Sequence, residues 1–201
     1  MKPEVTAKAI LAPPAGDEDW RVASLAALIR HIQCRYHEPL YEELPRLAEL
    51  FAEVLWQHGE AHVDLLVPLS DAFHVMANEV LNHLRKEEAV LFPAIVALEA
   101  AVAARDGLNH GDWTWIRQPL LTLKMEHAFA AAKLRTMRHR TGGYTPPDGA
   151  SAAFRELFQG LERLERDLSE HMAIENEILF PRAVALAQAD GPSFTVSYAG
   201  R

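Results

Sequence analysis

HLRKEEAVLFP, at residues 83–93, and HMAIENEILFP, at residues 171–181, are two copies of nearly the same phrase. Each copy has a histidine, a glutamate four residues later, and then Leu-Phe-Pro. On a helix, residues four apart lie about one turn from each other on the same face, so the histidine and the glutamate of each copy can reach one point. Duplicated packing around a kinked helix would not require both polar residues to recur. The repeat therefore predicts a polar site built on two helices.

Apolar residues surround both polar pairs, so each pair must face the protein interior for part of its length. A buried carboxylate is costly unless it is paired, hydrogen-bonded or bound to metal. A pair of cations resolves this conflict, because Glu87 and Glu175 can each bridge two metal ions while His83 and His171 take outer positions. Two alternatives stay open at this point. One is a pair of solvated surface contacts, and the other is a metal-free bundle whose polar core fixes helix register.

Three further histidines, His37, His58 and His127, lie on predicted helices that a bundle would place beside the two copies. Taken singly, each is as readily a hydrogen-bonded structural histidine as a metal ligand. As a set they raise the donors to five imidazoles and two carboxylates. These donors suit iron or manganese and disfavour copper(I) and iron–sulfur clusters.

The apolar pattern is helical along most of the chain. From Trp20, apolar residues recur at three- and four-residue steps, which predicts a short amphipathic helix. Longer helices are expected over residues 37–58, 68–103, 120–134 and 151–186, with Gly59 as a stop and a kink at Pro93. The β-rich FTVSY near the end is too short to build a sheet. The predicted fold class is all-α: an antiparallel four-helix bundle with a short extra N-terminal helix.

A length of 201 residues fits one domain. We expect a flexible N-terminal tail over residues 1–19, the bundle over residues 20–187, and a C-terminal tail over residues 188–201. The formal net charge of -8, with scattered Lys and Arg, argues against a nucleic-acid partner. The single cysteine, Cys34, excludes an intramolecular disulfide. We expect a cytoplasmic protein without a membrane partner, because no apolar run approaches the ~20 residues of a membrane span and a signal-peptide pattern is absent.

Five motifs in order resemble the hemerythrin-like domain of the repair-of-iron-centres proteins, di-iron proteins of nitrosative and oxidative stress. They are RYHEPLYEELPRL, His58, HLRKEEAVLFP, KMEH and HMAIENEILFPRA, and the resemblance covers about Trp20 to Leu186. It implies a left-handed four-helix bundle holding two non-haem iron ions, with an oxo bridge and with Glu87 and Glu175 as bridging carboxylates. The implied histidine ligands are His37, His58, His83, His127 and His171.

The resemblance also implies an activity. The family binds or reduces nitric oxide and supports repair of damaged iron–sulfur proteins by iron donation, so turnover would make the chain a di-iron oxidoreductase. Oxygen-binding or oxygen-sensing hemerythrins are the alternative, but their third helix has a His-x-x-x-His pair where this chain has only His127. Glu79 and Glu126 match acidic residues that lead small molecules to the irons, and we predict a catalytic role for both; a solvated helix face is the alternative. We expect the family's N-terminal cysteine-pair domain to be missing.

Overall fold

The computed structural model describes residues 19–104 and 113–189 of the chain, and within these ranges every regular element is a helix. The predicted all-α class is confirmed. The predicted tails fall almost entirely on residues outside these ranges. The α-helices are α1 (Leu25–Ile32), α2 (Glu38–Lys86), α3 (Phe92–Ala104), α4 (Arg117–Arg140), α5 (Ala152–Ile174) and α6 (Phe180–Ala189). Three π-helical segments, Gln33–His37, Glu87–Leu91 and Glu175–Leu179, and one 3-10 turn, Trp113–Ile116, complete the set.

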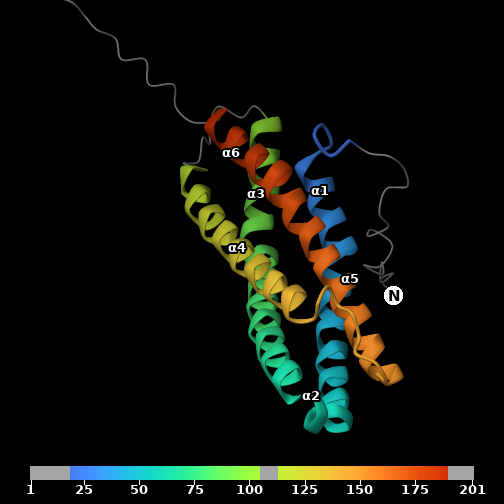
Figure 1. The fold of residues 1–201 in the computed structure, drawn as a ribbon. Coiled ribbons are helices and arrows are strands. Elements are labelled where there is room, and N and C mark those ends of the chain that lie inside the picture. Colours follow the sequence, from blue (N-terminus) through green and yellow to red (C-terminus); the bar gives the residue numbers. More distant parts are fainter. Residues whose placement is uncertain (1–18, 105–112, 190–201) are drawn as a thin grey trace, which may run out of the picture.

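Helix α2 folds back on itself at His62, whose φ of -132° and ψ of 29° are not helical. A straight helix rises 1.5 Å per residue, so His37 and Glu87 would lie about 75 Å apart if α2 were straight. Their side chains instead approach to 3.5 Å. Helix α2 therefore supplies two antiparallel arms (Figure 1), a first arm over residues 38–61 and a second arm over residues 63–86. The predicted stop at Gly59 was wrong, since the helix continues past it and breaks at His62.

Four rods form the bundle (Figure 1). The first runs from α1 through a π segment into the first arm of α2, and the second runs from the second arm through a π segment into α3. The third is α4. The fourth runs from α5 through a π segment into α6. The predicted short N-terminal helix is α1, which continues directly into the first rod.

Each π segment ends two residues before a proline: Pro39, Pro93 or Pro181. Proline has no N–H and its ring crowds the carbonyl four residues earlier, so an α-helix that meets a proline must bend or widen. Here the backbone widens. The N–H groups of Phe92 and Phe180 donate to the carbonyls of Glu87 and Glu175, five residues back. The kink predicted at Pro93 takes this form, and the widened turns contain residues of the predicted site.

Two apolar cores lie at different heights along the rods, with a polar layer between them. The lower core contains Leu40 and Leu84, and the upper core contains Ile32 and Leu91. Each rod passes from one core to the other through a short stretch that carries a buried histidine, a buried glutamate or both. Because water is excluded above and below, this layer must satisfy its own charges.

The connection from α4 to α5 is the loop predicted from TGGYTPPDGA. Gly142, Gly143 and Gly149 have positive φ, as does Tyr144, so the chain reverses direction in a conformation that favours glycine. Ser151 then caps α5, where its hydroxyl oxygen accepts the N–H of Phe154 at 3.2 Å. The tight loop and the cap set α5 antiparallel to α4.

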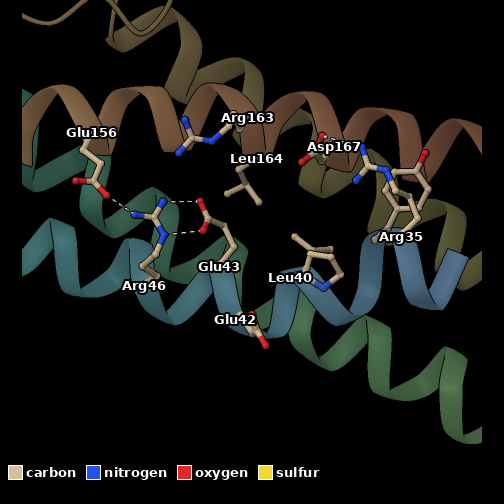
Figure 2. Close-up of a pocket in the computed structure, with 11 residues that line it drawn as sticks. Arg35, Leu40, Glu42, Glu43, Arg46, Glu156, Arg163, Leu164 and Asp167 are labelled. Carbon is tan, nitrogen blue, oxygen red and sulfur yellow. Dashed lines mark hydrogen bonds and ion pairs between the residues drawn. The ribbon is translucent and has the colours of Figure 1, made fainter. Parts of the chain in front are cut away.

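Gly160 lets α5 approach the first arm of α2 closely. A Cβ at Gly160 would lie 2.5 Å from Cδ2 of Leu47, which is fully buried, and 3.3 Å from the guanidinium of Arg46. Figure 2 shows the groove beside this contact, where Arg46 is paired with Glu43 and Glu156 at 2.7 Å each. The close approach of α5 to the first arm brings the buried histidine of the first rod next to the fourth rod.

Replacing Gly160 with alanine should destabilise the bundle. The added methyl must displace Leu47 from a packed position, and overpacking of this kind costs about 1–3 kcal/mol. The free energy of unfolding, measured by urea denaturation of the metal-free protein, should fall by that amount. Gly59→Ala is the matched control, because a Cβ there meets nothing within 4 Å and alanine favours the helix. Equal effects of the two substitutions would contradict this account of the contact.

Candidate metal centre

The polar layer consists of four histidines and two glutamates, one or more from each rod. All six are buried, and both glutamates are fully inaccessible. They are His37, His83, Glu87, His127, His171 and Glu175.

Each glutamate lies between two histidines. The carboxylate of Glu87 is 3.5 Å from Nε2 of His37 and 3.3 Å from Nε2 of His83. The carboxylate of Glu175 is 3.0 Å from Nε2 of His171 and 3.2 Å from Nε2 of His127. In both cases the two histidines approach different oxygens of the carboxylate, which is the arrangement that a bridging carboxylate needs.

The histidines also pair with one another across the layer. Nε2 of His37 lies 3.1 Å from Nε2 of His171, and Nε2 of His83 lies 2.9 Å from Nε2 of His127. Two four-residue groups result, one with His37 and His171 and the other with His83 and His127. Both groups include both glutamates, and in each the ligand atoms all lie within 4.8 Å of one another. The geometry therefore offers two adjacent cation positions that share two carboxylates.

The carboxylate oxygens of Glu87 and Glu175 are buried and accept no well-oriented hydrogen bond from the described residues, although imidazole nitrogens lie 3.0–3.5 Å away. An oxygen in this position is costly unless a cation satisfies it. Imidazole nitrogens and carboxylate oxygens are donors that suit iron and manganese. The residues present fit a pair of such metal ions.

The second ring nitrogen of three of these histidines is held by a neighbouring acceptor. Nδ1 of His37 lies 2.8 Å from Glu88, and Nδ1 of His83 lies 2.9 Å from Glu126. Nδ1 of His127 lies 3.1 Å from the amide oxygen of Asn176. A proton held on Nδ1 leaves the lone pair of Nε2 free for a metal and fixes the direction of the ring.

The phenylalanines of the repeated phrase support the histidines of the other rods. Phe92 stacks on His37, with ring centroids 5.5 Å apart, and Phe180 stacks on His127 at 5.8 Å. The recurrence of Leu-Phe-Pro thereby acquires a physical reason. Proline sets the widened turn, and phenylalanine packs against an imidazole of the layer.

Burial and mutual proximity shift the pKa values of the metal-free layer. Burial and the charge of Glu175 raise the pKa of Glu87, whereas burial and His171 lower the pKa of His37 to about 3. Burial also acts to lower the pKa of His83, but the nearby carboxylate of Glu87, 3.3 Å from Nε2, outweighs it and raises that pKa to about 9. The pKa of Glu175 is depressed because His171 and His127 outweigh its burial. Without metal, protons on imidazole thus offset the carboxylate charge.

The structure does not bring His58 to the layer. His58 lies 21 residues beyond His37 along the first arm, which places it about 30 Å away along a helix. It lies near the hairpin end instead, where its ring centroid is 5.4 Å from that of Phe154 and 6.3 Å from that of His62. The predicted fifth histidine ligand is therefore corrected to a packing residue.

Glu79 and Glu126 line a cavity of about 410 Å³ that reaches the layer between the second arm of α2, α4 and α5. The cavity reaches His83, His127 and His171, and its lining includes the exposed apolar side chains of Met125 and Phe129. Glu126 contacts Nδ1 of His83 directly, so it also orients a candidate ligand. Glu79 is exposed and lines the cavity from the second arm of α2. Their predicted catalytic role stays a prediction.

Glu88 and Asn176 were missed by the sequence reasoning. Each directly follows a bridging glutamate, so the repeat itself carried the signal, but the two residue types differ and drew no attention.

Comparisons with known proteins agree with this geometry. The family model of the hemerythrin HHE cation binding domain matches residues 114–183, which include His127, His171 and Glu175. The iron-sulfur cluster repair protein YtfE of Enterobacter sp. (strain 638) is 32% identical over 171 residues, 84% of this chain and 70% of that protein. The proteins of the same name from Escherichia coli O81 and Citrobacter koseri are 34% and 32% identical over the same shares. The chain belongs to the hemerythrin-like repair-of-iron-centres family.

Hemerythrin HHE domains bind non-haem iron, and the buried histidines and glutamates of this family member are positioned to hold such a metal site. The two four-residue groups that share Glu87 and Glu175 are the part of the chain that fits this metal site. Across the described ranges, none of the helices is long and apolar enough to cross a membrane.

Substitution of either bridging glutamate should abolish metal binding. Glu87→Ala and Glu175→Ala each remove one donor from both positions, so elemental analysis of purified protein should show iron falling from about two ions per chain to a small fraction. His58→Ala is the control and should retain the wild-type iron content, because His58 lies far from the layer. Loss of iron in His58→Ala would contradict the four-histidine assignment.

Chelation of the metal should lower the stability of the wild-type protein. A ligand that binds only the folded state stabilises it by about 2.7 kcal/mol at a free concentration 100 times its Kd. The temperature of thermal unfolding, followed by circular dichroism, should therefore drop on removal of iron. Glu175→Ala should unfold at the same temperature with and without chelator. An unchanged wild-type temperature would favour the metal-free bundle.

Proposed function

We propose that this family member holds two non-haem iron ions in residues 20–187, with Glu87 and Glu175 as bridging carboxylates beside an oxo or hydroxo bridge. His37 and His171 would serve one ion, and His83 and His127 the other. The observation that carries the proposal is that two imidazole pairs share the same two buried carboxylates. An isolated surface pair or a structural polar contact has no need for this sharing.

Iron in such a site supplies open coordination positions and a change of oxidation state. Two imidazoles and two carboxylate oxygens at each position leave room for a small ligand, as in other non-haem iron sites. The protein residues provide a dry pocket and fixed ligand directions. Phe92 and Phe180 exclude water from the imidazoles of His37 and His127, and the acceptors on Nδ1 hold the rings in place.

We propose nitric oxide as the small ligand and the cavity beside His83 as its route. Met125 and Phe129 give the mouth an apolar surface that an uncharged diatomic molecule can cross. Glu79 and Glu126 stand along the same path, where a carboxylate can hold a proton for a reduction. Glu126 contacts both Nδ1 of His83 and the ammonium of Lys86, and both contacts outweigh burial and lower its pKa, so this carboxylate would pass a proton on rather than hold it. The chain would then act as a di-iron oxidoreductase.

The relatives named iron-sulfur cluster repair proteins support a second part of the proposal. We propose that this chain also supports the repair of damaged iron–sulfur proteins by donating iron, in the cytoplasm. The two parts share one site, so both require iron in the polar layer.

Nitric oxide binding should appear as a change in the absorption spectrum of the reduced, iron-loaded protein. Titration under anaerobic conditions should reach saturation, and nitrous oxide should accumulate if the ligand is reduced. Glu175→Ala serves as the control that lacks the site. No spectral change with nitric oxide, or a stable and reversible adduct with dioxygen, would overturn the proposal and favour an oxygen-binding or oxygen-sensing role.

A further inference from the structure

The polar layer has an approximate twofold relation between its halves. One half consists of His37 from the first rod and the His83–Glu87 pair from the second rod. The other half consists of His127 from the third rod and the His171–Glu175 pair from the fourth rod, so His37 corresponds to His127, His83 to His171, and Glu87 to Glu175. The relation extends to the rings that pack on the layer. Phe92 stacks on His37 as Phe180 stacks on His127.

The same relation holds for one pair of Nδ1 contacts. The residue after each bridging glutamate supports the histidine outside the repeat: Glu88 contacts His37 at 2.8 Å, and Asn176 contacts His127 at 3.1 Å. Tyr41 donates its hydroxyl to Glu88 at 3.1 Å and holds that carboxylate in place. Both histidines outside the repeat are therefore oriented in the same way.

The relation fails at the other pair of Nδ1 contacts. Glu126, which directly precedes His127, contacts Nδ1 of His83 at 2.9 Å. The corresponding residue, directly before His37, is Tyr36. Its ring stacks on the ring of His171 with centroids 5.4 Å apart and an angle of 10° between the planes.

A stacked phenol ring presents its face to the imidazole and offers no acceptor in the imidazole plane. Nδ1 of His171 is accordingly buried without a hydrogen-bond partner among the described residues. The position of His83 and His127 has two supported imidazoles, and that of His37 and His171 has one. Each metal position has one imidazole supported by a carboxylate. The two positions differ in their second imidazole, which is supported by Asn176 in one position and stacked on Tyr36 in the other.

A hydrogen-bond acceptor on the distal nitrogen raises the basicity of a metal-bound imidazole, and its removal typically lowers metal affinity by about 10–100-fold. We infer that the two metal positions are unequal and that the His37–His171 position binds its metal more weakly and releases it first. Tyr36 is the positioning residue that sets this difference, acting through His171. The inference rests on the proposed occupancy of both positions and identifies which of them would donate iron.

The surroundings of Tyr36 fit a position from which metal leaves. Tyr36 also lines the groove of about 530 Å³ between the first arm of α2 and α5, and its ring stacks on that of His171. Figure 2 shows this groove. Arg35, whose guanidinium lies 5.0 Å from the ring centroid of Tyr36, covers the ring on the groove side. His171 also lines the cavity beside His83, together with His127.

The experiment measures iron release from the iron(II)-loaded full-length protein into a coloured iron(II) chelator. Wild-type protein should release its iron in two phases of equal amplitude, with rates that differ by about 10-fold or more. Tyr36→Glu restores the acceptor found in the other half and should slow the fast phase toward the slow one. Tyr36→Phe keeps the stacked ring and should leave both phases unchanged.

Asn176→Ala provides an independent variant on the other side of the layer. It removes the acceptor of His127 and should speed the slow phase by about 10–100-fold while leaving the fast phase alone. This variant decides the question even if Tyr36→Glu does not fold, which circular dichroism would reveal. A single release phase in wild-type protein, or an effect of Asn176→Ala on the fast phase alone, would overturn the inference. Wild-type protein without iron would contradict the proposed function instead.

Discussion

The structure depends on the burial of two carboxylates between two apolar cores. Glu87 and Glu175 are fully enclosed, and none of the described residues gives their oxygens a well-oriented hydrogen bond. Four imidazoles converge on them from all four rods, so the polar layer fixes how the rods are placed in height and rotation. In the metal-free chain the charge of Glu87 outweighs burial and raises the pKa of His83, which favours a protonated imidazole that offsets part of this charge. Cations that replace those protons would stabilise the same arrangement, which links metal binding to folding.

The sequence predicted the core of this site because the repeat carries a strong local signal. A histidine and a glutamate one turn apart, found twice, identify His83, Glu87, His171 and Glu175 from helical geometry alone. His37 and His127 came from the family resemblance and from their placement on predicted helices. His58 came from the same resemblance and lies elsewhere. A bundle places side chains in layers, and spacing of 21 residues along one arm separates two layers by about 30 Å.

The path of the chain was harder to read. Gly59 is a reasonable helix stop by composition, but it lies within the helix, and the reversal occurs three residues later at His62. Apolar contacts across the hairpin, such as that of Phe51 with Phe73, decide where the two arms meet. Such long-range packing overrides local propensity and leaves no pattern in a single stretch of sequence. The acceptors on Nδ1 depend in the same way on which rods become neighbours.

The three widened turns have a consequence for the sequence length of this fold. A π segment accommodates one residue more than an α-helix of the same rise, and each α-helical residue turns the chain by about 100°. Deleting one residue between Glu87 and Leu91 would therefore let this turn close into an α-helix of the same rise, with Ile95 still in the upper core. A regular α-helix through all the residues now present would instead rotate α3 by about 100° and carry Ile95 out of that core. The lower core would be untouched. Each π segment thus acts as a phase adjustment that lets one continuous rod satisfy two cores and the layer between them.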